Sequence, residues 1–220
     1  MCRPIIPTIK TDTGSFVLPE GVTTIGAHAF YHSRYSSIDL FNGDLTTINE
    51  GAFAYTSNLG GISIPANVTL STYLFAKSSV KYVEVDDSVD LKNASSIFNG
   101  VKNMEAFHFS ASTTVSPYTM FYTASLKFVL MNEGLLQLRG QTFHATSNLM
   151  HLHLPSTLTT IKGYGFGACN FDTLTIPDTL TNIEQYAFGT STVNNLIIEN
   201  IGVIKTYAFA QMNIKNSLII

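Results

Sequence analysis

A phenylalanine recurs along the chain at intervals of 21 to 23 residues. The series runs Phe30, Phe53, Phe75, Phe98, Phe121, Phe143, Phe166, Phe188 and Phe209. Five positions before the Phe stands an Ile or a Leu, except that Asn93 and Ser116 occupy this place in two repeats. A constant interval of this size indicates stacked structural repeats. The chain is therefore predicted to contain about nine units of roughly 22 residues.

An alternation of apolar and polar residues follows each Phe. The apolar–x–apolar triplets are predicted to begin at Phe16, Ile38, Ile62, Val83, Phe107, Phe128, Leu152, Leu174, Leu196 and Leu218. A period of two indicates a short β-strand with one buried face. Proline follows the strand at once in four units, where it ends the ladder. The apolar spacing just before the Phe instead predicts a short helical or 3₁₀ turn.

These units predict an α/β solenoid, with a parallel sheet on one face and short helical or 3₁₀ turns on the other. A single unit of this length buries too little apolar surface to offset its ordering entropy, so the units must stack. We expect one domain over residues 16–220 without an internal linker. Residues 1–15 are expected to form a lead-in that could cap the first strand.

The repeats resemble the BspA-like leucine-rich repeats, most closely in LPEGVTTIGAHAF, LPSTLTTIKGYGFGACNFDTLTIP and IPDTLTNIEQYAF. Cys169 stands at the Cys position of that family, and the resemblance covers residues 16–220. It implies a leucine-rich-repeat superhelix at the cell surface or outside the cell. It also implies a non-enzymatic, adhesin-like role toward a protein or glycan on another cell or on the matrix. The alternative is a structural subunit or spacer of a larger extracellular or viral-type assembly.

Composition and charge exclude several other partners. The net charge is −3, so no basic excess exists to neutralise phosphates, and nucleic acid is not expected as a partner. No run of 18 apolar residues occurs, so membrane insertion is not expected. The N-terminal residues lack the apolar core of a secretory signal, so the surface location depends on the resemblance. Cys2 and Cys169 form no disulfide framework or metal motif, and no cofactor is expected.

The outward positions of the predicted strands form two columns, and the solenoid is expected to bind through them. The first column takes the residue just before each triplet, which is Lys127 at the triplet 128–130. The second takes the middle residue of each triplet, which is Val129 there. The candidate partner-binding residues on this strand face are Tyr82, Glu84, His108, Lys127, His151 and His153. Ordinary solvated strand residues are the other interpretation. His151 and His153 lack Asp, Glu or Cys at ligand spacing, so no metal site is expected.

Three further patterns offer weaker candidates. Tyr164, Tyr186 and Tyr207 stand two residues before the Phe, with Tyr73 earlier in the column, and form either a recognition strip or a stabilising stack. The acidic segment 84–90 is interpreted as a solvated turn, because it lacks the pattern of a calcium loop. The glycines of residues 163–167 belong to the repeat itself. No Ser, His and acid set is brought together, so catalysis is not expected.

The last apolar residues, Leu218, Ile219 and Ile220, would leave an open strand edge. We expect this C-terminal edge to be covered by another subunit or by further sequence. The alternative is that the last strand frays and the domain ends near Met212.

Overall fold

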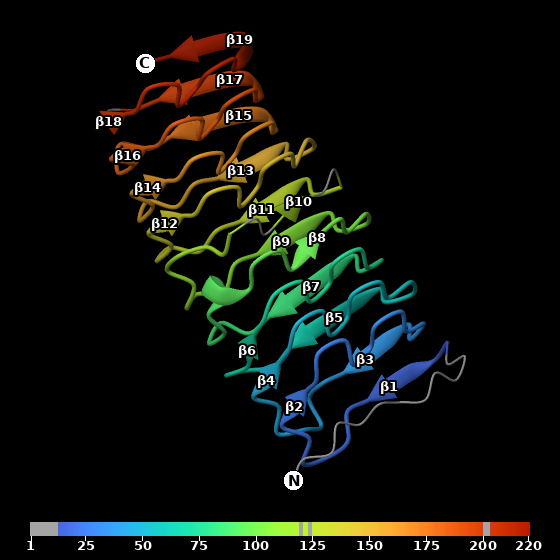
Figure 1. Cartoon of the computed structure of the whole chain (residues 1–220). Helices are drawn as coiled ribbons and strands as arrows, with labels where there is room; N and C mark the ends of the chain where they lie inside the picture. The colour runs from blue at the N-terminus through green and yellow to red at the C-terminus, as the bar shows by residue number, and fades with distance from the viewer. Residues whose placement is uncertain (1–12, 119–120, 123–124, 200–202) are drawn as a thin grey trace.

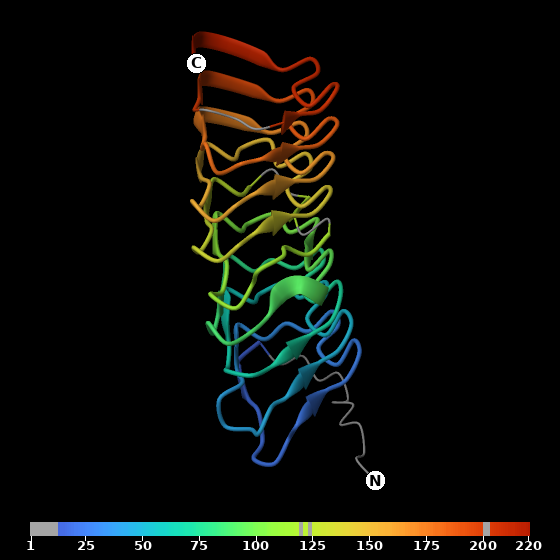
Figure 2. The same cartoon turned by 90° about the vertical axis from the view of Figure 1, so that its left-hand side faces the viewer.

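The structure, a computed structural model, describes residues 13–118, 121, 122, 125–199 and 203–220, and only the backbone of 121 and 122. The coils stack along one axis, with the N-terminal coil at one end and the C-terminal coil at the other (Figures 1 and 2). Every pairing between strands is parallel. The predicted solenoid is confirmed. Of the lead-in expected at residues 1–15, positions 1–12 lie outside the described residues.

One face of the solenoid is formed by strands whose inner residues enter the core. The first parallel sheet contains β1 (Ser15–Val17), β3 (Ser37–Asp39), β5 (Gly61–Ile64) and β7 (Tyr82–Val85). A second sheet continues beside β7 with β9 (Ala106–His108), β11 (Phe128–Leu130), β13 (His151–His153), β15 (Asn170–Ile176), β17 (Thr192–Ile198) and β19 (Asn213–Ile219). Together these two sheets form the strand face.

Shorter strands pair along another side of the coils. They are β2 (Thr24–Ile25), β4 (Thr47–Ile48) and β6 (Thr69–Leu70), and then β12 (Gln137–Leu138), β14 (Thr160–Ile161), β16 (Asn182–Ile183) and β18 (Val203–Ile204). They contain the Ile or Leu that precedes each Phe by five residues. A separate two-stranded sheet, β8 (Phe98–Asn99) with β10 (Phe121–Tyr122), lies in the middle coils.

The repeated phenylalanines form the centre of the core. Phe53, Phe75, Phe98, Phe143, Phe166 and Phe188 are at most 1% exposed. Neighbouring rings stack with centroids 5.1 to 5.8 Å apart from Phe30 to Phe98 and from Phe143 to Phe209, and Phe107 and Phe109 also pack between Phe98 and Phe143. Phe209 in the last described coil is half-buried, and the side chain of Phe121 lies outside the description. The burial that the sequence predicts for the repeated phenylalanines is therefore confirmed in the interior coils.

The Phe-bearing segment is a series of tight turns and not a helix, contrary to the sequence prediction. The only helix among the described residues is a 3₁₀ turn at Leu91–Asn93, η1. Around every repeat Phe except Phe121, the residues two before and two after have φ between +54° and +69°. In most coils before the last one, N–H groups of these residues and of the Phe donate to the next coil, as Phe53 N does to Leu74 O at 2.9 Å. These donors are therefore not available for the hydrogen bonds of a helix.

In two repeats the position five before the Phe has no Ile or Leu, and the structure fills this place differently in each. Ser116 is fully buried, and its hydroxyl bonds to Thr142 Oγ1 at 2.9 Å and accepts from Arg139 N at 2.9 Å. Asn93 is exposed, while Leu91 of η1 takes a fully buried place. Polar pairing replaces aliphatic packing in the first case, and a local change of backbone replaces it in the second.

One predicted strand register is wrong. Phe128 and Leu130 were expected to point inward, but they are 48% and 53% exposed, whereas Val129 between them is 5% exposed. Phe128 pairs with Ala106 and His151, and Leu130 pairs with His108 and His153. Val129 is therefore not in the outward column. Phe128, and not Lys127, takes the outward place beside Ala106 and His151. Burial of Val129 between Phe107 and Leu152 fixes this register, because a shift by one residue inverts the strand.

The two ends of the core differ. In the first coil Phe16 and Tyr35 lie against Phe30, which is 5% exposed. In the last coil Ile204 and Leu218 are 49% and 51% exposed, although the residues paired with them in the coil before, Ile183 and Leu196, are buried. Within the described chain, the C-terminal end is thus the open one. The described residues include no helix long and apolar enough to cross a membrane.

Candidate functional site on the strand face

The outward side chains of the strand face fall into two columns, because alternate residues of a strand point to opposite sides of a sheet. In the second sheet the first column contains Ala106, Phe128, His151, Thr173, Asn195 and Ser217. The other column contains His108, Leu130, His153, Thr175, Ile197 and Ile219. At β11 the exposed apolar side chains Phe128 and Leu130 lie among polar ones, and apolar side chains recur at Ile197 and Ile219.

A shallow hollow of about 530 Å³ lies over β11, β13 and the start of β15. Its outward lining is Phe128, Leu130, His151, His153, Asp172 and Thr173, and we call it the C-terminal hollow. The Phe128 and His151 rings stack with centroids 5.0 Å apart and an interplanar angle of 12°. The hollow therefore combines a stacked aromatic pair with the polar side chains of His153, Asp172 and Thr173.

A second, smaller hollow of about 290 Å³ lies over β3, β5 and β7. Its outward lining is Asp39, Phe41, Gly61, Ser63 and Tyr82, and we call it the N-terminal hollow. The Tyr82 ring lies across Gly61, where a Cβ atom would come within 2.0 Å of Tyr82 Cε2. The absent side chain of Gly61 thus gives the Tyr82 ring its position. Tyr82 and Phe41 remain 65% and 64% exposed.

Each hollow contains one aspartate whose carboxylate accepts a hydrogen bond from the protein through only one of its two oxygens. Asp39 Oδ1 accepts from Phe41 N at 2.9 Å, and Asp172 Oδ1 accepts from Asn194 Nδ2 at 2.8 Å. In both aspartates, Oδ2 accepts no hydrogen bond from the part of the chain that the structure describes. Each carboxylate is therefore oriented with an acceptor oxygen free for a ligand.

The six candidates predicted from the sequence do not form one patch. His151 and His153 line the C-terminal hollow, and Tyr82 lines the N-terminal hollow. Glu84 accepts from Ser63 Oγ at 3.0 Å beside Tyr82. His108 lies between the hollows, with Nε2 2.6 Å from Asn132 Oδ1. Lys127 is exposed but forms an ion pair with Glu105 at 3.2 Å and lines neither hollow.

Sequence reasoning missed Phe128, Leu130, Asp172 and Thr173. The repeat interval contained the signal for the first two, since Val129 lies 22 residues after Phe107 and 23 before Leu152. Asp172 and Thr173 both face outward because β15 has two exposed or half-exposed residues between the buried Phe171 and Leu174. Strict alternation does not predict that departure.

The tyrosine strip is a continuous stack. The Tyr164 and Tyr186 rings lie 5.2 Å apart, and the Tyr186 and Tyr207 rings lie 5.5 Å apart, with interplanar angles of 13° and 8°. Both faces of the Tyr186 ring are therefore covered by its neighbours, and Tyr164 and Tyr207 each have one face in the stack. Tyr73, 45% exposed, stands in an earlier coil of the same column. This geometry fits the stabilising interpretation better than the recognition interpretation.

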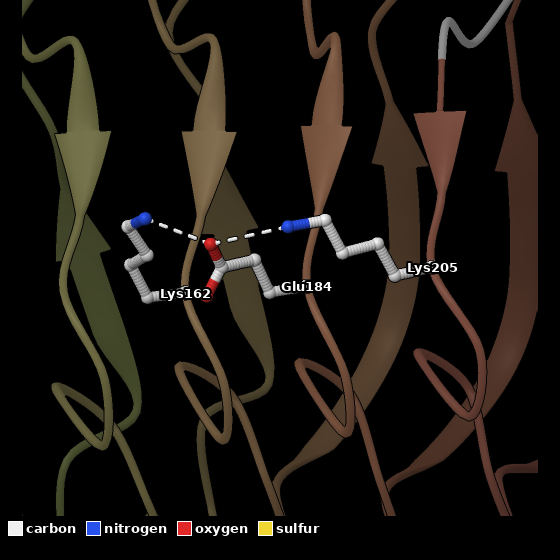
Figure 3. Close-up of polar contacts among 3 residues, drawn as sticks. All are labelled: Lys162, Glu184 and Lys205. Carbon is white, nitrogen blue, oxygen red and sulfur yellow. Dashed lines mark hydrogen bonds and ion pairs between the residues drawn. The ribbon is translucent and has the colours of Figure 1, made fainter.

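An ion-pair ladder lies beside the tyrosine strip, one residue after β14, β16 and β18. Glu184 Oε1 is 2.7 Å from Lys162 Nζ and 3.5 Å from Lys205 Nζ (Figure 3). Partial burial alone would raise the pKa of the Glu184 carboxyl. The hydrogen bond and charge of Lys162, and then the charge of Lys205, outweigh burial and hold this pKa below its usual value.

We expect Glu184→Gln to lower the free energy of unfolding at neutral pH by less than about 1 kcal/mol, because the two lysines are partly exposed and solvent screens the pairs. A depressed carboxyl pKa stabilises the fold above the unfolded pKa of about 4.3, and that stabilisation disappears as the pH falls through the folded pKa. Urea denaturation of wild type and variant at pH 7 and at pH 3 measures the difference. A gap that widens at acidic pH would contradict this assignment, and Lys205→Met should cost less than Lys162→Met.

The remaining candidate features have structural roles. Asp86 accepts from Ser88, Asp87 from Ala111 N, and Asp90 from Lys92 N at the start of η1. The described residues contain no group of three or more His, Cys, Asp or Glu side chains that could hold a metal ion. Cys169 is fully buried, and burial raises the pKa of its thiol.

The comparisons with known proteins agree with this architecture. Residues 10–105 and 113–220 match the family described as BspA type Leucine rich repeat region, in six copies. No match was found among curated proteins.

Two similar solved structures show the same fold. A leucine-rich repeat protein from Bacteroides ovatus is 18% identical with a TM-score of 0.63, and 93% of this chain and 65% of that one are covered. The pneumococcal vaccine antigen PcpA is 19% identical with a TM-score of 0.52, and 94% of this chain and 67% of that one are covered. This chain therefore spans about two thirds of each neighbour's length. Because the family match covers nearly all of its repeats, the chain belongs to the BspA-type leucine-rich repeat family.

Proposed function

We propose that this protein is a non-enzymatic recognition module, displayed as an adhesin at a cell surface or outside the cell, that binds a macromolecule through its strand face. The observation behind this proposal is the pair of hollows, where exposed aromatic rings lie beside oriented carboxylates. Membership in a repeat family that generally serves as a binding scaffold supports it. The likeness to a protein described as a vaccine antigen supports a surface location.

The test compares three purified proteins for adhesion to immobilised matrix proteins and to fixed epithelial cells. The first is wild type, and the second is a strand-face variant with Tyr82→Ser, Phe128→Ser, His151→Ala and His153→Ala. The third has Tyr164→Ser, Tyr186→Ser and Tyr207→Ser and controls for the loss of exposed aromatic surface. We expect the strand-face variant to bind at least tenfold more weakly than wild type, and the tyrosine-strip variant to retain binding.

Thermal unfolding of each variant checks that the fold survives the substitutions. Binding that persists in the strand-face variant but disappears in the tyrosine-strip variant would move the site to the other side of the solenoid. Binding by wild type to none of the surfaces would count against the adhesin role.

The second candidate function is that of a structural subunit, and the open C-terminal end favours it. On the last coil Val203, Ile204, Leu218 and Ile219 are each about half exposed, and β19 pairs on one side only. An apolar edge of this kind binds another chain readily. A building block would use this end, whereas an adhesin would use the strand face.

A further inference from the structure

We infer that the strand face binds a neutral oligosaccharide chain, with one sugar ring seated in each of the two hollows. This inference rests on the proposed function and names the chemical class of the partner. Both hollows contain the same set of groups: an exposed aromatic ring, an aspartate with a free oxygen, and a hydroxyl side chain. Phe128, Asp172 and Thr173 supply this set in the C-terminal hollow, and Tyr82, Asp39 and Ser63 supply it in the N-terminal hollow.

The aromatic rings are held in place before a ligand arrives. Phe128 is stacked on His151, and Tyr82 lies across the backbone at Gly61. A sugar ring has C–H groups on its faces, and burying them against an exposed aromatic ring removes apolar surface from water on both sides. Because the rings are already ordered, little side-chain entropy is lost on binding.

The polar groups match sugar hydroxyls better than they match an acidic ligand. Asp39 Oδ2 and Asp172 Oδ2 can accept from sugar hydroxyls, while Thr173 can donate as well as accept. The linings of the two hollows contain no lysine or arginine but do contain the two carboxylates. A sulfated or otherwise acidic sugar would therefore be repelled, and the inference is restricted to neutral chains.

The geometry favours a chain over a single sugar. The hollows are centred on β5 and β13, which are four strand positions apart along the solenoid, or about 19 Å at the usual strand spacing. A ligand that reaches both hollows gains from the second contact without paying again for association. An extended peptide finds no open strand edge within either sheet of this face, because the strands inside each sheet are already paired with their neighbours.

The experiment uses the whole chain on an array of neutral glucose, mannose, galactose and N-acetylglucosamine oligomers from one to six units, followed by calorimetry with the best hexamer and its dimer. We expect the hexamer to bind at least tenfold more tightly than the dimer. Phe128→Ser and Tyr82→Ser should each weaken hexamer binding about three- to tenfold, as should Asp172→Ala and Asp39→Ala. Tyr207→Ser and Asp178→Ala, which change an exposed aromatic ring and an exposed aspartate outside both hollows, should leave hexamer binding unchanged.

Several outcomes would overturn the inference. They are failure of every neutral oligomer to bind, equal affinity for dimer and hexamer, or tighter binding of a tetra-arginine peptide, whose guanidinium groups would use the same rings and carboxylates. Cell adhesion separates this failure from failure of the proposed function. If no oligomer binds but the strand-face variant still loses adhesion, the oligosaccharide inference fails and the proposal of a recognition site on the strand face stands. If adhesion also survives the variant, both are wrong.

Discussion

Phe143→Ala lowers the free energy of unfolding by about 3–5 kcal/mol, the usual cost of removing a fully buried phenylalanine. Phe143 is 0% exposed and stacks on Phe166 with centroids 5.1 Å apart and an interplanar angle of 4°. The coils on both sides cannot close the resulting cavity without breaking the ladder that fixes their spacing. Urea denaturation followed by circular dichroism measures the loss.

The matched control is Phe128→Ala, because Phe128 is 48% exposed on the strand face. We expect this change to alter the free energy of unfolding by no more than about 0.5 kcal/mol. Equal effects at the two positions would contradict the inward register of the Phe column and the outward register of β11.

At the C-terminal end, the 220-residue chain is expected to self-associate as its concentration rises, because β19 leaves strand backbone groups and apolar side chains open. Ile214→Lys combined with Leu218→Lys should shift the chain to a monomer in light scattering. Both residues pair with buried residues of β17 and are 36% and 51% exposed. The charges should therefore block a partner at modest cost to the fold.

A control with Thr173→Lys and Thr175→Lys, which adds the same charge to the strand face, should leave association unchanged. A wild-type chain that stays monomeric at high concentration, with fast hydrogen exchange confined to β19, would contradict a covered edge. That result would instead agree with fraying beyond Met212.

The interval between phenylalanines was sufficient to predict the solenoid, since Phe53, Phe75 and Phe143 are buried as expected and every ladder is parallel. It failed to predict the local backbone around them. Tyr164 and Tyr186 adopt a left-handed φ of 57° and 58°, a conformation in which a bulky side chain is rare. The hydrogen bonds from these turns to the next coil stabilise that conformation, and they depend on stacking that no single repeat reveals.

The candidate site was predictable only in part, for a related reason. His151, His153 and Tyr82 are polar or amphipathic residues in outward phase, so the pattern identified them. Phe128 was assigned to the core because it is apolar, although the position of Val129 in the repeat indicates the opposite. The free oxygens of Asp39 and Asp172 depend on which neighbour occupies the other oxygen, and that follows from the folded chain alone.

The nearest-neighbour stacking of the coils also determines how the protein responds to mechanical tension. An interior coil is held by the two beside it and a terminal coil by only one, so under tension a terminal coil should detach before the interior ones. Release of one coil of 21 to 23 residues lengthens the chain by about 7–8 nm at full extension. A tether built in this way would yield in steps, and the coils still folded would keep the hollows of the strand face assembled while the outermost coil gives way.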